Sequence, residues 1–352
     1  MRKKIKLGLL AVTLFVFAQY TNVFAMETDR YMLIPGGDAV GINIETNGLI
    51  VVDTYPVQTD NGEVTPAGDA GLMKGDIITA INGKTIIDIE EYKNELLARN
   101  GVIDLTVNRS GNLIQITIKG VNNTAGELST GVYLRNKIAG IGTLTYVDPA
   151  TKKYGALGHE ITNQDTNRII EIRKGELINS KITSIRKATD SQPGEKIAEI
   201  NFNHLFGTID KNNQYGIYGE MSTAYFNNKK QLPIAYRDEI QLGKATILTV
   251  IDGNNIEEFE IEIIEINNQP TQQIKGIKYV VTDPRLLEAT GGIVQGMSGS
   301  PIVQDGKIIG AVTHVLVHDS TLGYGVFIEW MLQESEINYK PIKKAITFKP
   351  AA

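Results

Sequence analysis

The chain of 352 residues contains no cysteine, only four histidines and one tryptophan. Without cysteine there are no disulfide bonds, thiolate metal sites or cysteine nucleophiles. The net charge is −5 and no long basic run lies beyond the N-terminus, so nucleic acid is not expected as a partner. A chain of this length with 42% hydrophobic residues can build two globular domains.

The N-terminus has the composition of an export signal. Basic residues occupy positions 2, 3, 4 and 6, and an apolar run of residues 7–18 follows, with Val-Phe-Ala at 23–25. This pattern predicts an export segment over residues 1–25, with a cleavage site after Ala25. An uncleaved membrane anchor stays open, because the apolar stretch can be extended to Ala25. Residues 26–32 are expected to be a connector.

Residues 33–120 have the organisation of one small module. A strand over 76–81, the tight turn Asn82-Gly83, a helix over 89–100 and two strands over 102–108 and 113–119 follow one another. The run AGLMKGDIITAINGK closely resembles the core of bacterial PDZ domains. That resemblance implies a peptide groove beside a strand, with its carboxylate-binding loop at four residues: Gly41, Ile42, Asn43 and Ile44. An empty groove, or one contacting the chain's own second domain, stays equally open.

Residues 126–335 change to short apolar strands punctuated by glycine, and 336–352 form a polar tail. Many strands at short spacing predict a barrel or sandwich. The expected fold is therefore mainly β, with a small PDZ α+β barrel followed by a trypsin-like double β-barrel.

The segment Gly-Met-Ser-Gly-Ser-Pro at 296–301 lies just before an apolar strand. Glycines around Ser298 allow a sharp turn that exposes the hydroxyl and frees backbone N–H groups, as an acyl-transfer site requires. A purely structural turn is the alternative, and Ser300 is a rival nucleophile. A serine nucleophile needs a base, and among the four histidines His159 follows a glycine-flanked strand end in the first half of this domain. No metal or cofactor is required, and no H-E-x-x-H pattern occurs.

Three segments together resemble the stage IV sporulation serine peptidase B family: GALGH at 155–159, VTDPRLL at 281–287 and GGIVQGMSGSPIVQDGKIIGAVTHV at 291–315. That family joins an export segment, a PDZ domain and a trypsin-like peptidase domain in this order. The resemblance implies catalytic Ser298, His159 and Asp283, with Thr313 as an alternative third residue. The backbone N–H groups of Gly296 and Ser298 would form the oxyanion hole. A structural turn aspartate before Pro284 is the competing interpretation of Asp283.

The biological role is also implied only by resemblance. Family members act in the space between forespore and mother-cell membranes, where they cleave themselves and a membrane-bound regulator of an intramembrane protease. This leads to processing of a mother-cell sigma factor precursor. Two other functions stay open: an envelope quality-control protease for unfolded proteins, and a catalytically inactive PDZ scaffold. An intact serine, histidine and glycine turn disfavours the scaffold.

Overall fold

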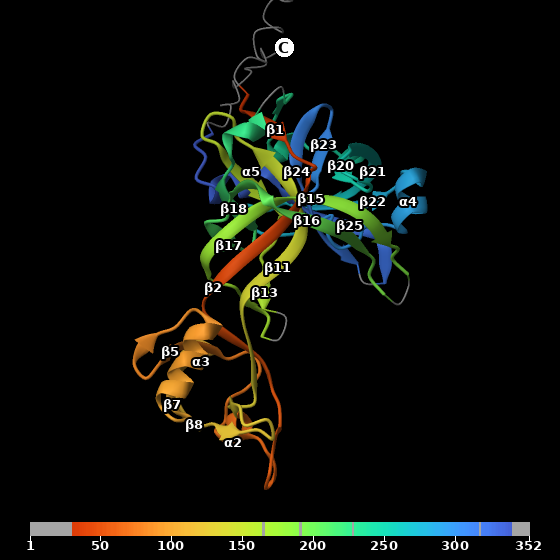
Figure 1. The fold of residues 1–352 in the computed structure, drawn as a ribbon. Coiled ribbons are helices and arrows are strands. Elements are labelled where there is room, and N and C mark those ends of the chain that lie inside the picture. Colours follow the sequence, from red (N-terminus) through yellow and green to blue (C-terminus); the bar gives the residue numbers. More distant parts are fainter. Residues whose placement is uncertain (1–29, 164–165, 190–191, 227–228, 317, 340–352) are drawn as a thin grey trace, which may run out of the picture.

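The computed structural model describes residues 30–163, 166–189, 192–226, 229–316 and 318–339. The predicted export segment lies outside these residues. No helix within them combines the length and hydrophobicity needed to span a bilayer. The predicted mainly β fold is confirmed: the described chain forms a small unit, orange in Figure 1, and a larger all-β unit.

The small unit is built by strands β5 (Ile77–Ile81), β7 (Val102–Arg109) and β8 (Asn112–Lys119) with helix α3 (Ile89–Ala98). The helix begins where the Asp88 carboxylate accepts a hydrogen bond from the Glu90 N–H. Its apolar face contributes to a core that also includes Leu49, Ile78, Leu105 and Ile118. Shorter elements complete the unit: β3 (Val57–Thr59), β4 (Gly62–Val64), α2 (Pro66–Asp69), β6 (Lys84–Thr85), β9 (Val121–Asn122) and β10 (Leu128–Ser129).

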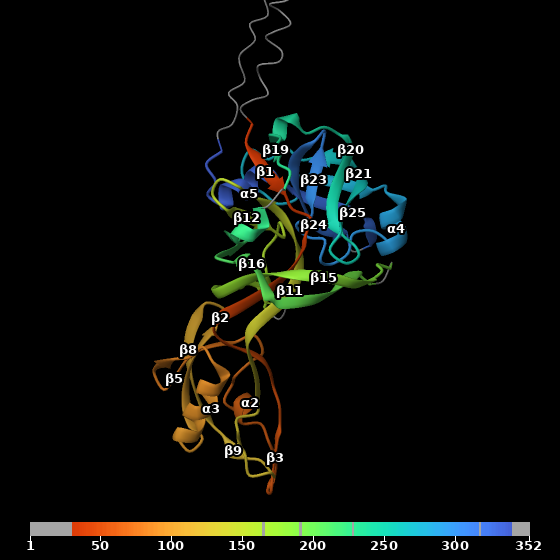
Figure 2. The same ribbon diagram turned by 45° about the horizontal axis from the view of Figure 1, so that its top comes forward.

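Two long strands, β2 (Ala39–Thr54) and β11 (Val132–Val147), connect the two units. They pair antiparallel along most of their lengths and run from one unit into the other, as both views show (Figures 1 and 2). Two register shifts bend the pair on the way. The sequence pattern predicts separate strands over 48–53, 132–135 and 138–146 here. An insertion of one residue interrupts the hydrophobic alternation without ending the strand.

The first half of the large unit is a curled sheet and not a closed barrel. It contains β1 (Met32–Pro35), β12 (Lys153–Ala156), β15 (Ile172–Arg186), β16 (Glu195–Thr208), β17 (Lys211–Asn213), β18 (Gly216–Glu220), β19 (Leu232–Pro233) and the first half of β2. After β12 in the chain, β13 (Thr162–Asn163) and β14 (Arg168–Ile169) pair as a separate two-stranded sheet. Residues 33–46 therefore pair within the large unit, although the sequence analysis placed them in the small module.

The second half is a closed six-stranded barrel in the order β20-β21-β22-β25-β24-β23. Its strands are β20 (Gly243–Val250), β21 (Ile256–Ile266), β22 (Ile277–Val281), β23 (Pro301–Gln304), β24 (Lys307–Leu316) and β25 (Asp319–Phe327). Helix α4 (Pro284–Thr290) leads toward β23, α5 (Ile328–Glu334) follows β25, and two 3-10 turns, η1 (Thr223–Phe226) and η2 (Arg237–Glu239), precede the barrel. Its fully buried interior includes Phe259, Tyr279 and Phe327.

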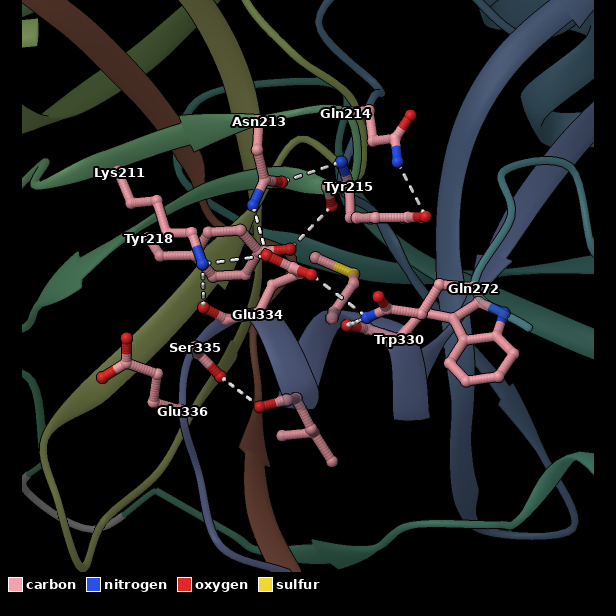
Figure 3. A network of polar contacts seen from close by, with 12 residues as sticks. Lys211, Asn213, Gln214, Tyr215, Tyr218, Gln272, Trp330, Glu334, Ser335 and Glu336 are labelled. Carbon is pink, nitrogen blue, oxygen red and sulfur yellow. Dashed lines mark hydrogen bonds and ion pairs between the residues drawn. The ribbon is translucent and has the colours of Figure 1, made fainter.

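The end of α5 ties the barrel to the curled sheet. The Glu334 carboxylate accepts hydrogen bonds from Lys211 Nζ at 2.8 Å and Asn213 Nδ2 at 2.6 Å, both on β17, and from Gln272 Nε2 at 3.1 Å. Figure 3 shows these three side chains pointing toward it. Nearby, Tyr146 of β11 shares a buried hydrogen bond with Ser335. These contacts link residues far apart in the sequence, so they resist separation of the two halves.

We expect Glu334→Gln to lower the free energy of unfolding by about 1–3 kcal/mol, because charge-assisted hydrogen bonds are replaced by weaker ones. Glu336→Gln is the matched control: that side chain is 78% exposed and lies 3.6 Å from Lys153. It should change stability by no more than about 0.5 kcal/mol. Urea unfolding of both variants measures this, and equal effects would show that the Glu334 contacts contribute nothing particular.

Candidate active site

The loop Gly296-Met297-Ser298-Gly299 crosses the boundary between the barrel and the curled sheet. Both of its glycines have positive φ, +92° and +93°, which residues with side chains adopt at a cost. Thr143 of β11 holds the loop from the curled sheet: its N–H donates to Ser298 O at 2.9 Å and its Oγ1 to Gly296 O at 2.7 Å. Thr145 Oγ1 donates to Gly299 O at 2.8 Å. The loop conformation is thus fixed from outside the barrel.

Two backbone donors of this loop are available to a substrate. Among the described residues, no acceptor pairs with the N–H of Gly296 or of Ser298, whereas Met297 N–H donates to Val294 and Gly299 N–H to Val312. Gly296 and Ser298 are half-buried and therefore reachable from solvent. Unused N–H groups two residues apart in a tight turn are the donors expected of an oxyanion hole.

His159 is carried to the same place by a turn that follows β12. Leu157 and Gly158 both have positive φ, +67° and +71°. A Cβ on Gly158 would lie 2.9 Å from Thr313 Cγ2 and 3.2 Å from Val312 O, so glycine lets this turn pack directly on β24. The imidazole of His159 lies half-buried beside His314 of β24.

The proton on His159 is positioned by the backbone. Its Nδ1 lies 2.8 Å from the carbonyl oxygen of Glu160. Because a carbonyl can only accept, Nδ1 carries the hydrogen and the neutral ring leaves Nε2 free to accept a proton. This is the tautomer a general base requires. Ser298 Oγ donates to Thr313 O at 3.1 Å, and no hydrogen bond links it to His159. The serine must rotate about its side-chain bond before His159 can take its proton.

Asp283, which the family resemblance implies as the triad carboxylate, makes its contacts at the start of α4 in this structure. It is the N-cap of α4 and accepts hydrogen bonds from the N–H groups of Arg285 and Glu260. It also forms an ion pair with Arg285 at 2.8 Å, and hydrogen bonding from that side chain lowers the pKa of Asp283. No bond joins it to His159. These contacts are those of a structural aspartate before Pro284, which is the competing interpretation given above.

Thr313, the alternative third residue, lies at the site without binding the imidazole. Its carbonyl accepts from Ser298, and its own Oγ1 donates to Tyr324 O at 3.0 Å.

The next residue, His314, was not assigned a role from sequence. Its ring centre lies 5.6 Å from that of His159, and its buried Nδ1 has no partner in the described chain. Burial, followed by the charges of His159 and Lys275, lowers the pKa of His314 to about 4, so it stays uncharged beside the base.

Burial excludes Ser300, the competing nucleophile. Ser300 is 0% exposed and cannot meet a substrate. His204 lies exposed on β16 and His318 is exposed next to β25. Among the described residues, no group of three or more histidine or acidic side chains is arranged to hold a metal ion.

The predicted PDZ peptide loop is also corrected. Gly41, Ile42, Asn43 and Ile44 lie in β2, with β11 paired along one edge and β15 along the other. Since both edges are occupied, no peptide strand can be added there. A cleft of about 890 Å³ lies elsewhere on the small unit, between α3 and the segment 122–134, lined by Tyr92, Leu96 and Leu128 among others.

Comparison with known proteins identifies both units. The model of the SpoIVB peptidase S55 family matches residues 126–332, and a PDZ domain model matches residues 62–109. No curated protein matches the chain. Among solved structures, the inactive form of the Rv3671c protease is 14% identical, with a TM-score of 0.32 over 55% of this chain and 83% of that one. The active form from M. tuberculosis is 12% identical, with a TM-score of 0.32 over 58% and 76%.

We expect Gly299→Ala to reduce activity by about 10²-fold or more, because the loop and its donors must shift. The new Cβ would lie 2.0 Å from Thr143 O and 2.4 Å from Leu157 N. Gly306→Ala is the matched control: φ is +71° there, but nothing lies within 4 Å of the added carbon. The control should stay within about twofold of the parent, since only local strain is added. Equal activity of both variants would contradict the role of this close approach.

We expect Asp283→Asn to lower the free energy of unfolding by about 1–2 kcal/mol through the weakened helix cap and ion pair. The turnover of the folded variant should stay within about tenfold of the parent. In trypsin-like enzymes, loss of the triad carboxylate costs about 10⁴-fold in turnover. A loss of that size, in a variant shown by circular dichroism to be folded, would restore Asp283 to the catalytic group.

Proposed function

Because the chain belongs to the SpoIVB peptidase S55 family, a family of serine peptidases, we propose that it is an exported endopeptidase of sporulation signalling. In this role it cleaves itself and then a membrane-bound regulator of an intramembrane protease, which leads to processing of a mother-cell sigma factor precursor. The observation that carries the proposal is the family match over residues 126–332, which includes both His159 and Ser298.

The chemistry follows from the site. Ser298 Oγ turns from Thr313 O toward His159 Nε2, and the histidine removes its proton as the oxygen attacks a peptide carbonyl. The N–H groups of Gly296 and Ser298 stabilise the negative charge that forms on the carbonyl oxygen. The imidazolium keeps its Nδ1–H bond to the Glu160 carbonyl and gives its other proton to the leaving amine. Water then hydrolyses the acyl-enzyme by the same route.

The substrate backbone would lie along β24, where Thr313 O already accepts a hydrogen bond from the serine and is released when that serine rotates. An extended peptide can pair with a strand in this way, and side-chain contacts then set the preferred sequence. His314, uncharged and beside His159, faces this route. A neutral residue at this point does not oppose formation of the imidazolium.

The proposed location is the space between the forespore and mother-cell membranes, reached through the export signal predicted over residues 1–25. Self-cleavage is proposed in the connector around residues 25–30 or further into the PDZ unit. The PDZ unit, matched over residues 62–109, would bind a peptide segment and either restrain or deliver the substrate.

Intact mass over time tests this proposal. The protein from residue 26 onward is compared with Ser298→Ala and His159→Ala. We expect discrete fragments from the parent alone, and little digestion of unfolded casein. Rapid casein digestion would favour envelope quality control over signalling. Fragmentation that persists in Ser298→Ala would contradict self-cleavage by this serine. If the parent and both variants stay intact and casein is not digested, the scaffold function would be favoured.

A further inference from the structure

A buried lysine packs against the turn that carries the oxyanion donors. Lys196 of β16 is 3% exposed. Its N–H donates to Gln295 O at 2.9 Å, and Gln295 N–H donates to Gly194 O at 2.9 Å, so a parallel bridge fixes β16 to the residue before Gly296. The Lys196 stem continues under the turn: its Cβ, Cγ and Cδ lie 3.2–3.4 Å from where a Cβ on Gly296 would stand.

The amine of Lys196 reaches an uncharged site. Nζ bonds Thr249 Oγ1 of β20 at 2.7 Å, and both residues are buried. Within the described part of the chain, no carboxylate forms an ion pair with it. Glu195, the neighbour of Lys196 in the chain, forms an ion pair with Arg186 at 2.7 Å. Glu257, which lies opposite Thr249 on β21, forms an ion pair with Arg285 at 3.6 Å. The loop 292–300 carries no charged side chain.

A charge in such a place is costly. Burial alone lowers the pKa of Lys196 from 10.5 to about 7, and no neighbouring charge contributes. An ammonium without a carboxylate partner is driven toward water, whereas a neutral amine is satisfied by the Thr249 hydroxyl. Because the stem lies against Gly296, an outward movement of the amine would also move the atoms that support the turn with the oxyanion donors.

We propose that Lys196 is a positioning residue of the oxyanion turn, which supports the active arrangement as a neutral amine and releases it on protonation. The peptidase site then requires two groups to lose a proton, His159 as base and Lys196 as support. This holds for any substrate, so it stands or falls independently of the signalling role.

The test is the rate at which a fluorophosphonate probe modifies Ser298, measured from about pH 5 to pH 9. On the acid side, the logarithm of the parent's rate should rise with a limiting slope of two, a change of about a hundredfold per pH unit. Lys196→Met keeps an apolar stem without the amine and should give a slope of one. Lys181→Met removes an exposed lysine from the paired strand β15 and should keep a slope of two.

A further measurement separates titration from misfolding. In urea unfolding, the unfolded chain binds one more proton than the folded one between about pH 7 and 10.5, so parent stability should rise over that window and the Met variant should lack this increment. A slope of two in Lys196→Met would overturn the proposal, as would a folded Met variant inactive at every pH.

Discussion

The active arrangement depends on Thr143, a residue of the curled sheet that binds both halves of the site. Its N–H and hydroxyl hold the nucleophile loop at Ser298 O and Gly296 O, while its carbonyl accepts the N–H of Leu157, two residues before the histidine. One position on β11 therefore contacts both the nucleophile loop and the turn that precedes the base. The same strand also runs into the PDZ unit.

The second feature of this site is that its immediate polar contacts are uncharged. A backbone carbonyl selects the tautomer of His159, a second carbonyl holds the resting serine, and His314 lies beside the base without a charge. The carboxylate of Asp283 binds the N-terminal end of a helix and an arginine. The hydrogen bond from Ser298 to Thr313 O must break before catalysis, so the structure describes a resting state in which the serine is not bonded to His159.

Local motifs predicted the tight turns around Ser298 and before His159 well, because they encode backbone geometry. Glycines around Ser298 and before His159 have positive φ and close packing, so their function can be inferred from sequence. The PDZ core was similarly clear, with its helix found within two residues. Contacts between distant segments were not visible. The two-sided pairing of residues 41–44, the committed carboxylate of Asp283 and the burial of Lys196 each depend on strands brought together only by the fold.

The most direct test of this account is the site at which a fluorophosphonate attaches, mapped by peptide mass. The account predicts one adduct per chain, on Ser298, formed at the parent's rate in Ser300→Ala and far more slowly in His159→Gln. An adduct on another residue, or an unchanged rate in a folded His159→Gln variant, would contradict the assignment of Ser298 as nucleophile and His159 as its base.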